Sequence, residues 1–181
     1  MTKAIRFSET GGPEVLRLEI VEVGEPGPSQ ARVRHTYVAV NFIDIYYRTG
    51  RYPLPLPNGL GSDAVGVVEA VGPGVTDIKV GDRVGYLLGP QGAYSDVRAM
   101  PAEVLIPLPD GVSDRTTSRP AMVTYATPRP HMLAMADELF GLVLAGQIKS
   151  EPSQSFALAD AAHAHRALES RATTGATVLI P

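Results

Sequence analysis

The sequence contains no cysteine, which excludes disulfides, thiolate metal ligands and a cysteine nucleophile. It also lacks any block of like charge: 16 basic and 19 acidic side chains give a net charge of −3, spread along the chain. That balance argues against a nucleic-acid partner and a basic membrane anchor. No run approaches 18 apolar residues, and MTKAIRFSETGG has no apolar core of signal-peptide length. We therefore expect a soluble, cytoplasmic protein with no membrane partner.

The composition that is present divides the chain into two unlike halves. Residues 1–110 hold 14 of the 18 glycines and 11 of the 16 prolines, whereas residues 121–181 hold 13 alanines. Glycine and proline punctuate strands with turns, and alanine favours helix. The first half is therefore predicted to be strands and the second mainly helical. With 44% apolar residues, the 181-residue chain can bury a real core.

Short apolar runs in the first half predict strands separated by turns. Their spacing is typical of an antiparallel barrel or sandwich. The alternation over residues 15–20 predicts one face on the core and one in water. The expected strands cover residues 3–7, 15–23, 31–40, 64–72, 82–88, 93–100 and 103–108.

The second half predicts two helices and a final strand. The first helix is predicted within the stretch 128–146. Pro130 suits its first turn, and Gly146 suits the position just past its end. The second covers residues 158–170, and residues 177–181 follow as a strand. Helical spacing predicts an apolar stripe on the first helix, formed by Met132, Met135, Leu139, Leu142 and Val143.

Four stretches occur in an order that carries a family resemblance. They are GGPEVL (11–16), NFIDIYYRTGRYP (41–53), GLGSDAVGVVEAVGPGV (59–75) with GDRV (81–84), and the final AHRALESRATTGATVLIP. Together they resemble the quinone oxidoreductases of the medium-chain dehydrogenase/reductase superfamily, over residues 1 to about 114 and again from about 117. The resemblance implies a GroES-like domain, so we expect an α+β, mainly β fold: a partly open β-barrel with two or three helices.

The family's Rossmann domain, which would bind NADPH, is not found between these two blocks. LPDGVSDRT (108–116) runs directly into TSRPAMVTYAT (117–127), which resembles the segment that follows the nucleotide domain. Gly72-Pro73-Gly74 lacks a third glycine and precedes no helix, so it predicts a turn between strands. We expect one domain over 1–181, assembled from 1–115 and 116–181. Its seam at about 113–118 marks a nucleotide domain removed by engineering or by natural deletion.

Three residues are candidates for the substrate site. The resemblance places Asn41, Tyr46 and Tyr52 in the cleft where nicotinamide and quinone meet, with Asn41 also touching the cofactor. An amide and phenolic hydroxyls can donate hydrogen bonds to oxygens gaining charge, and the rings offer stacking surface. From the residues alone, the favoured interpretation is that Asn41 is the N-cap of a short helix and both tyrosines are half-buried aromatics; the resemblance favours the cleft for all three. Asn41 can perform both roles.

A catalytic zinc is not expected. Related alcohol dehydrogenases place a cysteine near the position of Asn41 and a His-Glu pair where Ser62 and Asp63 stand here. A catalytic zinc needs about three protein ligands, and Asp63 offers one. In the quinone branch that position is a glutamate, so the shorter Asp63 is expected to alter the hydrogen bonding beneath the cleft.

The histidines give no metal pattern either. His163 and His165 are two apart and point to opposite sides of a helix, so both are predicted to be solvated or at the core edge. The sequence shows no partner for His35 or His131. Ala176 stands where many relatives carry a lysine that reaches cofactor phosphate, which further reduces the expected cofactor affinity.

The sequence thus favours the substrate domain of an NADPH-dependent quinone oxidoreductase, without turnover of its own and without tightly bound NADPH. A second hypothesis from another class is a non-enzymatic GroES-like binding or scaffold module. Loss of the nucleotide domain would leave an apolar wall exposed, and such surfaces mark interfaces. We therefore also expect self-association.

Overall fold

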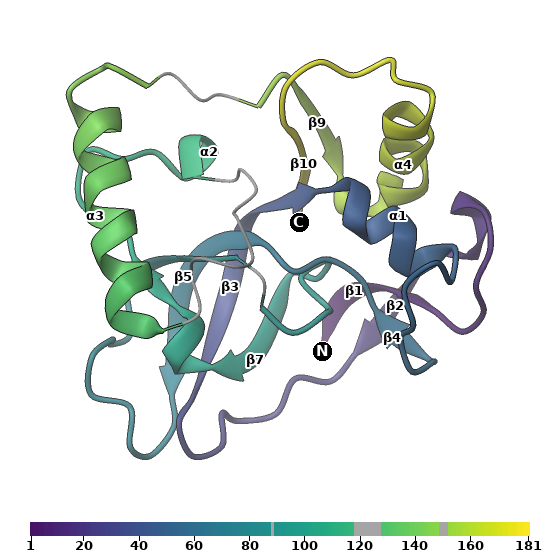
Figure 1. Ribbon diagram of the computed structural model, residues 1–181. Helices are drawn as coiled ribbons and strands as arrows, with labels where there is room; N and C mark the ends of the chain where they lie inside the picture. The colour runs from purple at the N-terminus through teal and green to yellow at the C-terminus, as the bar shows by residue number, and fades with distance from the viewer. Residues whose placement is uncertain (88, 118–127, 149–151) are drawn as a thin grey trace.

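The fold is mainly β, as Figure 1 shows for a computed structural model that describes residues 1–87, 89–117, 128–148 and 152–181. The helices are α1 (Phe42–Arg48), α2 (Asp114–Thr117), α3 (Arg129–Leu144) and α4 (Ala161–Glu169), with 3₁₀ turns η1 (Pro13–Val15), η2 (Ala102–Val104) and η3 (Leu158–Asp160). The strands are β1 (Thr2–Phe7), β2 (Arg17–Val21), β3 (Gln30–Val40), β4 (Asn58–Gly59), β5 (Ala64–Val71), β6 (Arg83–Tyr86), β7 (Val97–Pro101), β8 (Ile106–Pro107), β9 (Gln154–Ala157) and β10 (Thr177–Ile180).

Within the described residues, the strands form two sheets, of three and seven strands. The small sheet has the order β2-β1-β4, and the large sheet has the order β8-β6-β5-β3-β10-β9, with β7 also paired to β3. The expected mainly β, α+β fold is confirmed, with an open rather than a closed barrel. Region 103–108 is a 3₁₀ turn followed by the short β8, and the sequence prediction missed β4 and β9.

β3 is the central strand of the large sheet. One edge of β3 pairs with β5, and the other edge pairs with β7 over its first residues and with β10 over its last. Val38, Ala39 and Val40 face Leu179, Val178 and Thr177 in the β10 pairing. The two blocks of sequence that flank residues 118–127 therefore share one sheet.

Gly66 permits a close approach at the centre of this sheet. It pairs with His35 where the β3–β5 register shifts between His35 and Tyr37. A Cβ at Gly66 would lie 2.1 Å from the carbonyl oxygen of Arg34. Only a residue without a side chain fits this bulge.

One strand pair of the described residues is parallel. β9 and β10 run in the same direction, and η3 and α4 form the crossover between them. The other pairs described are antiparallel, as the short, punctuated runs of the first half predicted.

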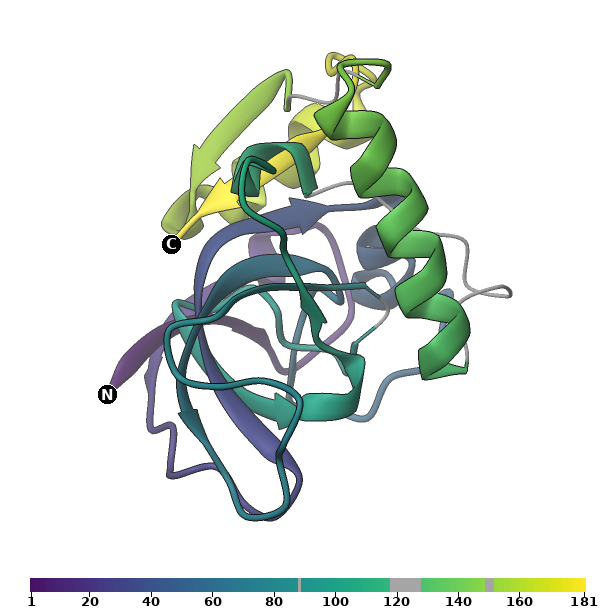
Figure 2. The same cartoon turned by 90° about the vertical axis from the view of Figure 1, so that its left-hand side faces the viewer.

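The main core draws residues from both blocks. Val33, Leu60 and Tyr94 of the first block share one buried cluster with Leu158 and Leu179 of the second. A second cluster lies beneath α3, which stands at one side of the fold in Figure 2. Among the described residues, no helix combines the length and apolar character needed to cross a bilayer.

The apolar stripe expected on α3 is partly wrong. The helix buries Met132, Ala136 and Phe140, which repeat at four-residue spacing, against Val65, Ile106, Leu108 and Val112. Met135 and Leu139 are instead 37% and 49% exposed. Because α3 is apolar on more than one side, spacing alone could not select the buried side.

The burial expected for residues 15–20 is also wrong at β2. Leu18 and Ile20 are 43% and 62% exposed although the strand alternates apolar and polar residues. Along β2, Arg17 to Ile20 are all exposed, so neither face of this edge strand is covered by other described residues. Alternation identified the strand but not whether a layer covers it.

Candidate functional site

Asn41 stands at the junction of the central strand and α1. It follows Val40 of β3 directly and is the N-cap residue of α1, with extended backbone angles (φ −118°, ψ 155°). Asp44 completes a capping box, because its Oδ2 accepts a hydrogen bond from the Asn41 backbone N–H at 2.8 Å. The capping role proposed from sequence for Asn41 is confirmed, and the strand end fixes its position.

Asp63 holds the side chain of Asn41. The Asn41 Nδ2 donates to Asp63 Oδ2 at 2.7 Å, and the Ser62 hydroxyl donates to the other oxygen of Asp63 at 3.2 Å. The backbone of Asp63 is tied to β3, since its carbonyl accepts from the Ala39 N–H at 3.0 Å. Asp63 is 5% exposed, so this contact is largely shielded from water. Ser62 and Asp63 of the GLGSD motif thus form one hydrogen-bonded group with the Asn41 side chain.

Tyr46 and Tyr52 form an aromatic pair beyond Asn41. Their ring centroids lie 5.4 Å apart at 67°, and the Tyr52 N–H donates to the Tyr46 carbonyl at 3.0 Å. The guanidinium carbon of Arg51 lies 4.7 Å from the centroid of the Tyr46 ring. Tyr47 also contacts Tyr52, with centroids 5.7 Å apart. The structure thus brings the two predicted tyrosines together, while the hydrogen bond of the Asn41 amide goes to Asp63.

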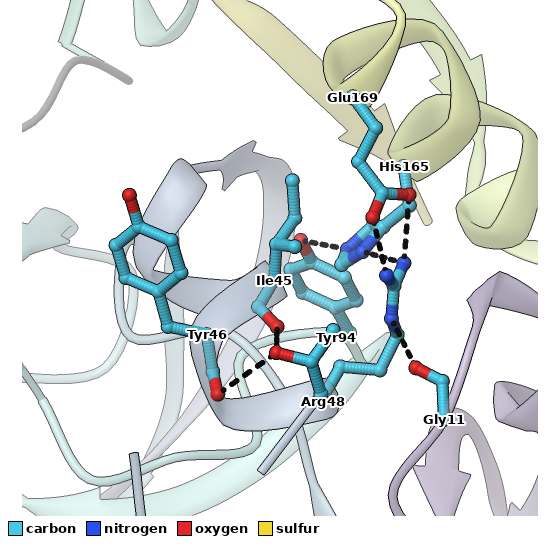
Figure 3. A network of polar contacts seen from close by, with 8 residues as sticks. Gly11, Ile45, Tyr46, Arg48, Tyr94, His165 and Glu169 are labelled. Carbon is cyan, nitrogen blue, oxygen red and sulfur yellow. Dashed lines mark hydrogen bonds and ion pairs between the residues drawn. The ribbon is translucent and has the colours of Figure 1, made fainter. Parts of the chain in front are cut away.

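A buried polar network lies on the other side of α1. Figure 3 shows the Arg48 guanidinium between Glu169 and His165 of α4 and the Gly11 carbonyl, while the Tyr46 ring points away from them. Arg48 is 1% exposed, and its Nη2 lies 2.6 Å from Glu169 Oε1. This cluster fastens α1, which follows Asn41, to the helix of the second block.

The network continues through Tyr94 to Asp44. Arg48 can only donate, so its Nη1, 3.1 Å from His165 Nδ1, makes that nitrogen an acceptor. The neutral imidazole then carries its proton on Nε2 and donates to the Tyr94 hydroxyl at 3.1 Å. Tyr94 in turn donates to Asp44 Oδ2 at 3.0 Å. A single directed chain of hydrogen bonds therefore leads from α4 to the cap of α1.

Burial shifts the pKa values in this network. Desolvation, followed by the Arg48 charge, lowers the pKa of His165 to about 3, so the ring is neutral at pH 7. Desolvation raises the pKa of Asp44 to about 7, against hydrogen bonds from Asn41 and Tyr94 that lower it. The nearby Asp63 raises the Asp44 pKa further, and Asp44 Oδ1 is buried without a hydrogen-bond partner.

His35 is a second buried histidine. Its Nδ1 donates to the Ser95 carbonyl at 2.7 Å, and its Nε2 accepts from the Tyr86 hydroxyl at 2.9 Å. Burial lowers its pKa to about 4. Sequence gave no partner for His35 and predicted a solvated or core-edge His165, whereas both are buried and hydrogen-bonded. Each partner is distant in sequence, which is why spacing could not find it.

These shifts predict how stability depends on pH between 4.5 and 6. Each histidine is neutral when folded and protonated when unfolded, so each adds stability as pH rises. Asp44 is protonated when folded and ionised when unfolded, so it removes stability as pH rises. With two groups against one, the free energy of unfolding should rise by about 1 kcal/mol per pH unit.

The Asp44→Asn variant removes the opposing group, so its slope should be about twice that of the wild type. Urea unfolding at a series of pH values measures both slopes. Equal slopes would show that Asp44 does not titrate with a raised pKa.

The described residues do not fit a dinucleotide diphosphate. Such a group needs a glycine-rich turn between a strand and the N-terminus of a helix. Gly72-Pro73-Gly74 instead packs on the loop before β3, where the Gly72 N–H donates to Gln30 and the Ser29 N–H donates to Pro73. The βαβ unit of β9, α4 and β10 passes through Ala157, Leu158, Ala159 and Asp160, without glycine.

The described residues also offer no site for a metal ion. No group of three or more histidine or acidic side chains in the described part of the chain could hold a metal ion. Asp63, the ligand considered from sequence, is occupied with Asn41 and Ser62.

Comparison with known proteins identifies the class of the fold. The family described as the alcohol dehydrogenase GroES-like domain matches residues 27–110, which run from just before β3 to just after β8. Residues 27–110 thus carry the match to a GroES-like domain, which agrees with the mainly β fold. The proteins that the chain resembles in sequence and in structure include quinone oxidoreductases.

One relative in sequence is a quinone oxidoreductase of Pseudomonas aeruginosa, which is 54% identical to this chain over 113 residues. That match covers 62% of this chain and 35% of the relative, so the chain spans about a third of the relative's length. The expected resemblance is confirmed at this level.

The structural relatives extend over the whole chain. A quinone oxidoreductase from Pseudomonas syringae pv. tomato has a TM-score of 0.94 at 27% identity, covering 100% of both chains. An Escherichia coli quinone oxidoreductase complexed with NADPH has a TM-score of 0.95 at 23% identity, covering 99% of this chain and 100% of that one. The latter shares the fold.

Proposed function

We propose that this chain is the acceptor-binding domain of an NADPH-dependent quinone oxidoreductase and has no turnover by itself. The observation that carries the proposal is the 54% identity to a quinone oxidoreductase of which the chain spans 35%. In the complete enzyme, a hydride would pass from NADPH to the quinone, and uptake of one proton would give the hydroquinone. The described residues lack a diphosphate site, which supports the proposed lack of turnover.

We also propose that the chain is one domain, built from 1–115 and 116–181, with the nucleotide domain absent at about 113–118. The shared sheet and shared core support this assembly. The chain at the start of the seam is anchored, because Asp114 accepts hydrogen bonds from Arg83 and from Thr36. A host whose sheet closes without the insert is suited to insertion or removal of a domain. Residue 118 lies outside the described residues.

In this proposal Asn41, Tyr46 and Tyr52 bind the acceptor, and Asn41 would meet the nicotinamide in the complete enzyme. The half-buried Asn41 supplies a hydrogen-bond donor. The edge-to-face tyrosine pair supplies aromatic surface against which a flat acceptor ring can pack. No zinc is required.

Stopped-flow NADPH oxidation with duroquinone, whose ring has no unsubstituted position, tests the proposal. At high protein concentration we expect no saturable turnover, and an NADPH dissociation constant weaker than about 1 mM, which is roughly −4 kcal/mol. Duroquinone should nevertheless shift the nuclear magnetic resonance signals of Asn41 and Tyr46, with Tyr37 on β3 as the internal control. Saturable turnover would contradict the proposal.

A binding or scaffold module is the second candidate, and one observation favours it. Met135, Leu139 and Leu144 of α3 are between 37% and 53% exposed, and α3 buries its other side on the core. Such a surface suits a protein partner or a second copy of this chain. Concentration-dependent mass in sedimentation, without any duroquinone shift, would favour this candidate over the first.

A further inference from the structure

The orientation of the Asn41 amide follows from its neighbours. A carboxylate can only accept hydrogen bonds, so the Asn41 nitrogen, and not its oxygen, faces Asp63 at 2.7 Å. The amide oxygen is the opposite end and points toward the start of α1, where the Asp44 N–H donates to the Asn41 backbone carbonyl at 3.1 Å. Asp63 therefore assigns the nitrogen end of the amide, and the position of the oxygen follows.

This orientation leaves Asn41 with one amide N–H beyond the one that Asp63 accepts. The amide nitrogen has two hydrogens, and one is used by Asp63. The oxygen is directed at the start of α1. The remaining N–H is a donor, so a bound molecule can satisfy it only with an acceptor such as a carbonyl oxygen.

Asp63 is well placed to enforce this orientation. Its carboxylate is held on the far side by the Ser62 hydroxyl at 3.2 Å, and its backbone by Ala39 of β3 at 3.0 Å. Gly61 (φ +87°) lets this loop pack tightly, since a Cβ there would lie 2.3 Å from the Tyr94 ring. The carboxylate therefore presents a fixed oxygen to a half-buried partner.

We propose that Asp63 is the positioning residue of the acceptor site: it holds one N–H of Asn41, so that the other is presented to a ligand carbonyl. This inference rests on the proposed function, because it gives Asn41 its role toward a quinone. It adds a specificity for the ligand: a hydrogen-bond acceptor of the ligand binds at Asn41, and a hydrogen-bond donor is disfavoured there. Asp63 stands where the resemblance implies the longer glutamate. In this proposal it acts through Asn41 and does not touch the ligand.

The first measurement requires no ligand. In the wild type, one of the two Nδ2 protons of Asn41 should resonate downfield and exchange slowly with water, while the other exchanges faster. In Asp63→Leu, which has similar size but no acceptor, this difference should disappear. Asp63→Asn can still offer an oxygen to the Asn41 N–H, so it should retain most of the difference between the two Nδ2 protons. Asp110→Leu, the same substitution at an exposed carboxylate away from Asn41, is the matched control.

The second measurement is duroquinone affinity in the same variants. Asp63→Leu should weaken binding roughly five- to tenfold, the cost of losing about one well-directed hydrogen bond. Asp63→Asn and the control Asp110→Leu should stay within about twofold of the wild type. A protein in which Asp63→Leu binds duroquinone as tightly as the wild type would overturn the proposal.

The two measurements separate this inference from the proposed function. If wild-type Asn41 shows two equivalent, fast-exchanging protons, the positioning role of Asp63 is wrong, and this holds even if Asp63→Leu does not fold. If those protons behave as expected but duroquinone does not bind the wild type, the orientation stands and the proposed acceptor function fails.

Discussion

Arg48→Met is expected to lower the free energy of unfolding by about 3–5 kcal/mol, the usual result of removing one partner of a buried ion pair. Arg48 is 1% exposed and connects α1 to Glu169, to His165 and to the Gly11 carbonyl. Methionine fills similar space but leaves each of these acceptors without its donor. Urea unfolding monitored by circular dichroism measures the loss.

Arg51→Met is the matched control, because Arg51 belongs to the same segment but is exposed and contacts only the Tyr46 ring face. It should cost about 1 kcal/mol or less. A loss of the same size in both variants would mean that the buried contacts of Arg48 contribute nothing specific.

Gly66→Ala is expected to cost about 3 kcal/mol, at the top of the range for overpacking a core. The added Cβ would lie 2.1 Å from the Arg34 carbonyl and 2.9 Å from the His35 Cα, and both are backbone atoms of the central strand. Backbone cannot move aside as a flexible side chain can. For a chain of this size the melting temperature should fall by about 6–12 °C.

Gly141→Ala provides the opposite expectation for the same chemical change. Gly141 lies within α3, and a Cβ there meets nothing within 4 Å. Alanine in a helix interior is favoured over glycine by about 0.5–1 kcal/mol, so this variant should melt slightly higher than the wild type. Similar melting temperatures for both variants would contradict the close approach at Gly66.

The sequence predicted the fold well where the signal was local. The turn residues and apolar runs located β1, β3, β5 and β6, and proline and glycine placed the ends of α3 within a few residues. It could not predict which apolar side chains are covered. Leu18 and Met135 have the pattern of core residues but are exposed, because their burial depends on which elements become neighbours.

In the candidate site, too, the local features could be predicted and the long-range contacts could not. Asn41 as an N-cap followed from its place before a short helix, and the structure confirms it. The polar network could not be predicted, because Arg48 and Glu169 are 121 residues apart and Tyr94 and His165 are 71 apart. A hint was available: His165 lies on the side of α4 shared with the buried Ala161 and Leu168.

The position of β10 also bears on how the protein is made. During synthesis, residues 38–40 of β3 emerge long before residues 177–179, with which they pair. Until then that end of β3 offers unpaired backbone groups to any neighbouring chain. A partly made chain is therefore the form most exposed to aggregation, and chaperone demand should be greatest before residues 177–180 leave the ribosome.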